Sequence, residues 1–170
     1  MVSGGTIITT DNSIVFDGSQ VLSATFTSVP LPEVTMLLMF RSYDTGLMQF
    51  FTGSDVALNI NDFFITRMAN GVSRVHVRNS SNVLTYFDAN RLSSYVTGQT
   101  VGGGVLGLIE GNEVIQTASC GAVSLNRKIT LGNLNMKSKL YCYKLYNKAL
   151  TADELKTEVY NMRTQYTFIN

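Results

Sequence analysis

Short runs of β-branched and aromatic residues recur along this chain, and Gly, Asn, Asp and Ser separate them, which is the pattern of β-strands joined by turns. Residues 34–43 form the most apolar run, so we expect a strand that is buried on both faces or central in its sheet. Residues 72–78 alternate instead, which predicts that Val75 and Val77 share one face of a strand. The expected strands lie at residues 6–10, 13–16, 20–27, 34–43, 47–52, 56–60, 63–68, 72–78, 83–87, 105–110, 113–117, 129–131 and 140–146.

Glycine-containing pairs predict the tight turns between these strands. Asp17-Gly18 and Asn70-Gly71 are two-residue hairpin signals because glycine takes a positive φ without a Cβ clash. Gly111-Asn112 suits a hairpin turn with glycine at its first position. The glycine run at 102–104 predicts a bend or a close approach of strands, with an irregular start to the strand that follows.

The C-terminal region predicts one helix, at about residues 151–164. Thr151 is the expected N-cap and Glu154 follows three residues later, which is the spacing of a capping box. Leu150 and Leu155 occupy the positions of a hydrophobic staple around this start. The apolar stripe of this helix consists of Leu155, Val159, Met162 and Tyr166, and the first three are expected to dock on the strands.

Many short strands followed by one terminal helix predict an all-β fold. The expected architecture is a two-sheet antiparallel jelly-roll sandwich with one C-terminal α-helix. The chain shows no internal repeat, linker or break in composition. Residues 1–170 are therefore expected to form a single domain.

Three segments resemble concanavalin A-like, laminin-G-like jelly-roll domains. Residues 146–155 read Tyr-Asn-Lys-Ala-Leu-Thr-Ala-Asp-Glu-Leu and are similar to the closing segment of that family, Tyr-Asn-(Arg/Lys)-Ala-Leu followed by Ser/Thr-x-x-Glu-(Ile/Leu). Residues 16–19 resemble its opening Phe-Asp-Gly turn, and residues 108–114 resemble one of its hairpins. The resemblance implies the jelly-roll fold and a class of modules that bind glycans or proteins, act on virions or cell surfaces, or accompany hydrolases. The acidic cluster of the family's calcium-binding members is not found.

The chain carries few charges. Charged residues make up 15% of it, against about a quarter in a typical domain, and the net charge is +1. This charge provides no field for nucleic acid or for an anionic membrane, so neither partner is expected. No apolar run is long enough for a transmembrane helix, and the first residues do not read as a secretory signal peptide.

The residue types for metal binding and catalysis are scarce. Cys120 and Cys142 are expected to be separate thiols, with a single disulfide as the alternative, and with one histidine they do not make a metal site. Glycoside hydrolysis needs two carboxylates, and the nearest pair, Glu110 and Glu113, is expected to be solvated turn charge. His76, the one candidate base, lies between two arginines and is expected on the surface. We therefore expect no metal, no other cofactor and no enzyme activity.

Two patches are candidate binding sites. The first is a loop region with two tyrosines and polar side chains, which could pack on a sugar ring and bond its hydroxyls. The second is a cationic stripe on the polar face of residues 72–78, for an acidic glycan or a protein partner, with an ordinary exposed sheet face as the alternative. The first patch consists of Tyr86, Asp88, Asn90, Arg91 and Tyr95, and the second of Arg74, His76 and Arg78.

The sequence leaves three functions to compare. The first is a non-enzymatic virion-associated module, such as a phage capsid decoration, fibre or tail protein, made in the host cytoplasm. Its expected partners are other virion proteins or a host-surface glycan, and it could be a homo-oligomer. The alternative is an extracellular carbohydrate-binding module of a bacterial protein. A hydrolase of the same fold is disfavoured because paired carboxylates are missing.

Overall fold

The computed structural model describes residues 2–3, 8–10, 13–18, 21–25, 32–42, 48–49, 63–67, 73–89, 96–110, 113–124, 128–131 and 137–165. Its main sheet has seven strands, in the order β12 (Glu113–Ser119), β11 (Val105–Glu110), β10 (Val96–Gly102), β5 (Val34–Ser42), β14 (Lys137–Tyr146), β3 (Ser13–Asp17) and β2 (Ile8–Thr10). A four-stranded sheet contains β6 (Met48–Gln49), β7 (Phe63–Arg67), β8 (Ser73–Arg78) and β9 (Leu84–Ala89). A three-stranded sheet contains β1 (Val2–Ser3), β4 (Val21–Thr25) and β13 (Lys128–Leu131). The helix α1 (Ala152–Gln165) follows the last strand.

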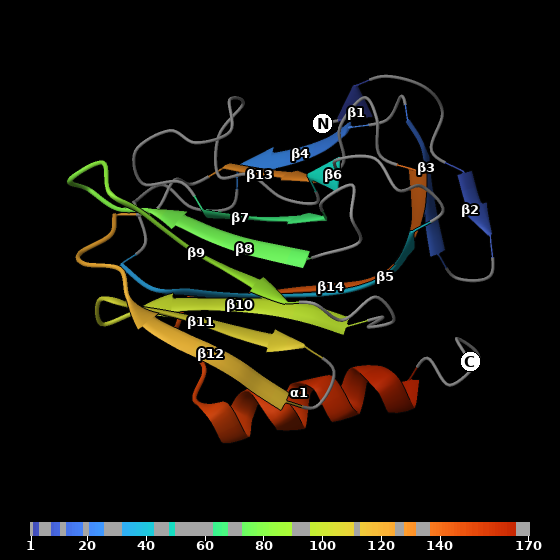
Figure 1. Cartoon of the computed structure of the whole chain (residues 1–170). Coiled ribbons are helices and arrows are strands. Elements are labelled where there is room, and N and C mark those ends of the chain that lie inside the picture. The colour runs from blue at the N-terminus through green and yellow to red at the C-terminus, as the bar shows by residue number, and fades with distance from the viewer. Residues whose placement is uncertain are drawn as a thin grey trace.

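The sheets form a sandwich, as predicted, because the two smaller sheets cover one face of the main sheet. Val77 of β8 and Leu131 of β13 pack in the same buried cluster as Leu38 of β5. All strand pairs among the described residues are antiparallel. Figure 1 shows α1 on the opposite side of the main sheet, below β10, β11 and β12. The chain is therefore an all-β sandwich with one C-terminal helix.

Strand β5 is buried on both faces, which confirms the prediction from its apolar run. Met36, Leu38 and Phe40 point into the core between the sheets. Leu37 and Met39 point the other way and pack with the buried residues of α1. Because successive side chains of a strand alternate between its two faces, a strand covered on both sides needs a continuous apolar sequence.

The predicted capping box forms at the start of α1. The Thr151 N–H donates to Glu154 Oε2 at 2.8 Å, and the Glu154 N–H donates to Thr151 Oγ1 at 3.3 Å. Leu150 and Leu155 are both buried, which confirms the staple. The buried residues of the helix are Leu155, Val159 and Met162, whereas Tyr166 lies outside the described residues.

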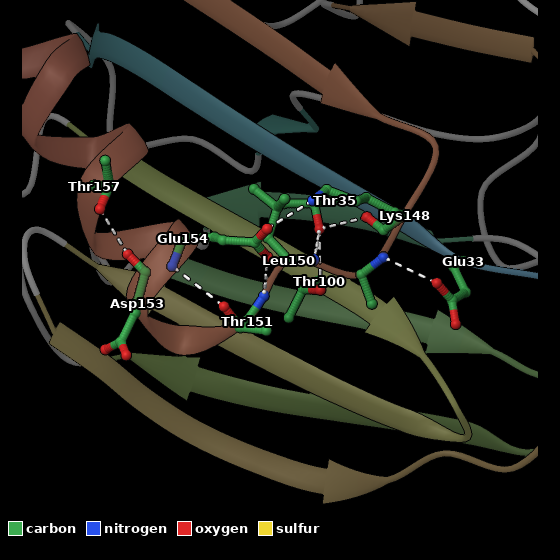
Figure 2. Close-up of polar contacts among 10 residues, drawn as sticks. Glu33, Thr35, Thr100, Lys148, Leu150, Thr151, Asp153, Glu154 and Thr157 are labelled. Atoms are coloured by element: carbon green, nitrogen blue, oxygen red, sulfur yellow. Dashed lines mark hydrogen bonds and ion pairs between the residues drawn. The ribbon is translucent and has the colours of Figure 1, made fainter.

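The connector between β14 and α1 is held by residues at the start of β5 (Figure 2). Thr35 Oγ1 accepts a hydrogen bond from the Leu150 N–H at 2.9 Å and lies 2.9 Å from the Lys148 carbonyl oxygen, to which it donates. Glu33 Oε2 accepts from the Ala149 N–H at 3.3 Å. The connector belongs to the segment that resembles the family's closing motif, and these bonds fix where the helix begins.

The predicted hairpin at Asp17-Gly18 is wrong. The chain turns there, with φ of 102° at Gly18, but β3 pairs with β2 and β14 whereas β4 pairs with β1 and β13. The turn therefore carries the chain from one sheet to another. A glycine pair signals a change of direction, and the partner of each strand is set by packing over long sequence distances.

The other glycine signals agree better with the structure. Strands β7 and β8 pair on either side of residues 70–71, and β11 and β12 pair on either side of residues 111–112. Gly103 and Gly104, with φ of 56° and 76°, turn the chain between β10 and β11. A Cβ at Gly102 would lie 2.5 Å from the Ala149 Cβ, so the chain approaches closely here, although Ala149 lies in the connector between β14 and α1 and not in a strand. The expected irregular start of the strand at 105–110 is wrong, because β11 pairs with β10 in an unbroken register from Val105 onward. The sequence did not predict β10 itself, and the expected strand at 56–60 lies outside the described residues.

Candidate functional site

The two candidate patches meet on the outer face of β8 and β9. Val75 and Val77 point into the core, as the alternation predicted. Their neighbours in β8 therefore point outward, and the register places Arg74 opposite Asp88 and His76 opposite Tyr86. We call Arg74, His76, Tyr86 and Asp88 the β8–β9 cluster. The sequence analysis did not predict that the two patches lie together. The register could have been predicted by pairing the residues of the two strands one by one, starting at the turn after residue 78.

An ion pair joins the two strands within the cluster. Arg74 Nε donates to Asp88 Oδ1, and Arg74 Nη2 donates to Asp88 Oδ2 at 2.7 Å. The hydrogen bond to Asp88 raises the pKa of Arg74, and the same bond lowers the pKa of Asp88. The two side chains retain 27% and 39% of their exposure, so the pair remains in contact with solvent.

Tyr86 presents an exposed ring in the middle of the cluster. It keeps 50% of its surface exposed. The guanidinium carbon of Arg74 lies 4.5 Å from the centroid of the ring, a cation–π contact. The His76 ring lies 6.2 Å away, centroid to centroid, at an interplanar angle of 36°. The contacts with Arg74 and His76 limit the orientations of the Tyr86 ring, and the ring remains accessible to solvent.

His76 is buried, which contradicts its predicted place on the surface. Only 7% of it is exposed. Burial, followed by the positive charge of Arg74, lowers its pKa to about 3. His76 is therefore uncharged near neutral pH. A sequence alternation places a residue on the outer face of a sheet, but it does not show which neighbours cover that residue.

The predicted cationic stripe is largely neutralised. Arg74 is paired with Asp88, and His76 is uncharged. Arg78 turns toward the end of the strand, where Nη1 donates to Asn82 Oδ1 at 2.8 Å and to the Asn82 carbonyl at 3.3 Å. The outer face of β8 is therefore not a row of three positive charges.

Asn79 holds the turn between β8 and β9, and sequence reasoning missed it. Its buried side-chain oxygen accepts from the N–H groups of Ser81 and Val83 at 3.0 and 2.8 Å. Its Nδ2 donates to the Cys120 carbonyl at 2.8 Å. A Cβ at Gly121 would lie 2.8 Å from this Nδ2. The only signal in the sequence was the run of turn-forming residues at 79–82.

The structure places the other tyrosines of β14 and α1 away from the β8–β9 cluster. Asn90, Arg91 and Tyr95 lie outside the described residues. The tyrosines of β14 are partly buried. Tyr143 packs on the core between the sheets, whereas Tyr141 and Tyr146 pack on the buried residues between the main sheet and α1. The tyrosine of α1, Tyr160, is 66% exposed and lies on a different element from the cluster.

The glutamates considered for catalysis and the two cysteines are not members of the β8–β9 cluster. Glu110 and Glu113 pair across the β11–β12 hairpin, where they were expected. Cys120 and Cys142 are not joined by a disulfide, and they pack against different buried clusters. Burial raises the pKa of Cys120. In the part of the chain that the structure describes, no three His, Cys, Asp or Glu residues gather as metal ligands, and no helix is long and apolar enough to cross a bilayer.

Solved structures share this fold. The botulinum neurotoxin serotype D ligand binding domain in complex with N-acetylneuraminic acid has a TM-score of 0.73 and 12% identity, and the match covers 95% of this chain and 46% of that chain. The binding domain of botulinum neurotoxin DC in complex with SialylT has a TM-score of 0.72 and 10% identity, with the same coverage. The native heptameric SAP-like pentraxin from Limulus polyphemus has a TM-score of 0.64 and 10% identity, over 93% of this chain and 80% of that chain.

These neighbours are β-sandwich jelly-roll domains, which agrees with the predicted fold class. This chain spans less than half the length of the toxin domains that it matches. No family model matches the sequence, and no curated protein sequence matches it. At such low identity the likeness shows the fold alone, so a function has to be argued from the residues of this chain.

Proposed function

We propose that this domain is a non-enzymatic recognition module that binds carbohydrate on the β8–β9 cluster. Tyr86 carries the proposal, because its ring is half exposed while Arg74 and His76 contact it. An exposed aromatic ring with a limited range of orientations is a surface on which the C–H face of a sugar can pack, with little loss of side-chain freedom on binding.

The groups beside the ring suit hydroxyl groups. The guanidinium of Arg74 has N–H groups besides the two that bond Asp88, and each carboxylate oxygen of Asp88 has more than one lone pair. A sugar hydroxyl both donates and accepts, so it can use either partner. Sites that recognise small ligands combine an apolar surface with a few fixed polar groups in this way.

The cluster is built on regular strands and supported from below. Asn79 ties the β8–β9 turn to the Cys120 carbonyl, and Gln99 Nε2 donates to the His76 carbonyl at 2.6 Å. Side chains on such supported elements keep their geometry better than side chains on free loops. This support favours recognition by a preformed surface.

The non-enzymatic part of the proposal rests on the composition of the cluster. Cleavage of a glycosidic bond uses a pair of carboxyl groups, one as acid and one as nucleophile or base. The cluster has one carboxylate, Asp88, and that group is engaged by Arg74. Its histidine has a pKa of about 3, far from the value that suits a general base at neutral pH. The neurotoxin neighbours are binding domains, which supports recognition by analogy of fold.

For the location, we propose the surface of a virus particle, with an extracellular module of a bacterial protein as the alternative. The near-neutral charge of the chain supports either place and disfavours packaging with nucleic acid. Mass spectrometry of purified virus particles distinguishes the two locations. Detection of the chain in particles supports the virion, and its absence there together with recovery from culture medium supports the alternative.

Glycan-array binding of two tyrosine variants tests the proposed function. Tyr86→Ala should weaken binding about tenfold or more, since stacked aromatic groups in binding sites commonly contribute above 1.4 kcal/mol. Tyr160→Ala is the matched control, because it removes an exposed tyrosine from α1. The control should bind as the parent does. Equal binding by the parent and Tyr86→Ala would show that the β8–β9 cluster is not the binding site. If the parent bound no glycan, the proposed function itself would be wrong.

A further inference from the structure

The charges of the cluster cancel one another. Arg74 contributes one positive charge, Asp88 one negative charge, and they bond through two hydrogen bonds. His76 contributes no charge near neutral pH, because burial disfavours its protonated form. The surface around Tyr86 therefore offers polar groups without a net charge, although the sequence alone predicted a cationic patch for an acidic glycan or a protein partner.

The geometry of the ion pair decides which ligands Arg74 can take. A guanidinium binds a carboxylate best through two parallel N–H···O bonds. Asp88 already occupies such a fork, through Nε and Nη2 of Arg74. A sugar carboxylate at this Nε–Nη2 edge would have to displace Asp88, and one at the remaining Nη1–Nη2 edge would lie beside the like charge of the Asp88 carboxylate. A neutral hydroxyl needs no displacement, because single N–H groups and lone pairs at the rim suffice for it.

We propose that the β8–β9 cluster selects neutral over acidic sugars, and that Asp88 is the specificity-determining residue because it keeps the fork of Arg74 occupied. This inference rests on the proposed carbohydrate-binding function and names the ligand class of that site. Asp88 acts by excluding the acidic sugar from Arg74. A protein can discriminate between two ligands in this way as well as by adding contacts to the preferred one.

A matched pair of ligands tests the inference. Methyl β-D-glucoside and methyl β-D-glucuronide differ at one position, a hydroxymethyl group against a carboxylate. Binding to the parent, to Asp88→Asn and to Asp153→Asn is measured by ligand-observed NMR. Asp88→Asn removes the charge from the cluster with little change of shape, whereas Asp153→Asn removes the same charge from the exposed first turn of α1.

The parent and Asp153→Asn should prefer the glucoside. Asp88→Asn should shift the preference toward the glucuronide by about two- to fivefold, the range of one solvent-exposed ion pair. The double variant Arg74→Gln with Asp88→Asn should lose that gain, because the released guanidinium is what receives the sugar carboxylate. The Asp153→Asn control makes the same change in net charge as Asp88→Asn, so it shows whether the gain comes from the released Arg74 or from net charge.

The outcomes separate this inference from the proposed function. If the parent binds glycans on the array through Tyr86, but Asp88→Asn discriminates between the two glycosides as the parent does, the specificity assignment is wrong and the function remains. A parent that prefers the glucuronide overturns the assignment in the same way. If the parent binds no glycan at all, both fail together.

Discussion

The side chain of Gln99 in β10 donates a hydrogen bond of 2.6 Å to the backbone carbonyl of His76 in β8. This bond crosses the sandwich, because β10 belongs to the main sheet and β8 to the four-stranded sheet. Gln99 is fully buried, and a hydrogen bond is electrostatically stronger in such an interior than in water. The candidate site is therefore tied to the central sheet from beneath.

Replacing Gln99 with leucine should loosen β8 locally. Loss of the donor from a buried carbonyl costs about 1–3 kcal/mol, and removal of Gln99 Oε1, which is buried without a hydrogen-bond partner, offsets part of this. We expect a net loss of about 1 kcal/mol in the free energy of unfolding. Amide hydrogen exchange should accelerate in β8 more than in β5. Thr117→Ala, an exposed change on β12, is the control, and equal exchange in β8 for both variants would contradict the role of the bond.

The stability of the domain should fall as the pH is lowered from about 6.5. His76 is the only histidine, and its pKa is lowered from 6.5 to about 3 in the folded state. The unfolded chain therefore binds more protons between these values, and the free energy of unfolding should decrease by up to about 1.4 kcal/mol per pH unit. Asp88 and Glu158 also have lowered pKa values in the folded state, from 3.8 and 4.5. The stability that these carboxylates contribute is lost only as the pH falls below those values, well under the part of the range near pH 6.5.

His76→Gln isolates that contribution. Urea denaturation of the parent and the variant between pH 6.5 and pH 5 is compared. The slope of unfolding free energy against pH should flatten in the variant, since no other histidine titrates there. The same slope in both proteins would show that His76 is not the group responsible.

The start and the docked face of α1 should contribute unequally to stability. Thr151→Ala removes the hydroxyl that accepts from the Glu154 N–H and should cost about 1 kcal/mol. Leu155→Ala empties a buried position against β5 and should cost about 2–5 kcal/mol. Lys156→Ala, an exposed change on the same helix, should be close to neutral. Denaturant midpoints measure all three, and equal midpoints for Leu155→Ala and Lys156→Ala would refute the docking of the helix.

Gly102 and Ala149 should be energetically coupled. A Cβ at Gly102 would lie 2.5 Å from the Ala149 Cβ and 3.1 Å from the Glu33 Cγ, so Gly102→Ala should destabilise the domain by about 1–3 kcal/mol through overpacking. Adding Ala149→Gly makes room and should recover part of this loss. A double-mutant cycle in denaturant measures the coupling, and purely additive effects would show that the two residues do not compete for space.

Local signals in the sequence predicted local structure well. The capping box at Thr151, the two-sided burial of β5 and the alternation of Val75 and Val77 all follow from neighbours within one element. Such patterns depend on helix and strand periodicity, which the sequence contains directly. The hairpin at Asp17-Gly18 failed because its outcome depends on β14, which lies far along the chain and takes β3 as its partner.

The sequence predicted the four residues of the site, but it did not predict that they lie side by side. Tyr86 and Asp88 were assigned to one patch and Arg74 and His76 to another, although the register pairs them across two strands. The charge of the site follows from that pairing. An arginine counted as a free cation in the sequence becomes one half of an ion pair, and a histidine counted as exposed becomes buried and uncharged.

Mapping of amide chemical shifts during a glycan titration locates the carbohydrate-binding surface. The parent protein, labelled with ¹⁵N, is titrated with the glycan that binds best on the array. We expect the largest shifts on residues 74–88 of β8, β9 and their turn, and we expect Tyr86→Ala to abolish them. Saturable shifts that fall instead on another face of the sandwich, and that persist in Tyr86→Ala, would contradict the assignment of carbohydrate recognition to the β8–β9 cluster.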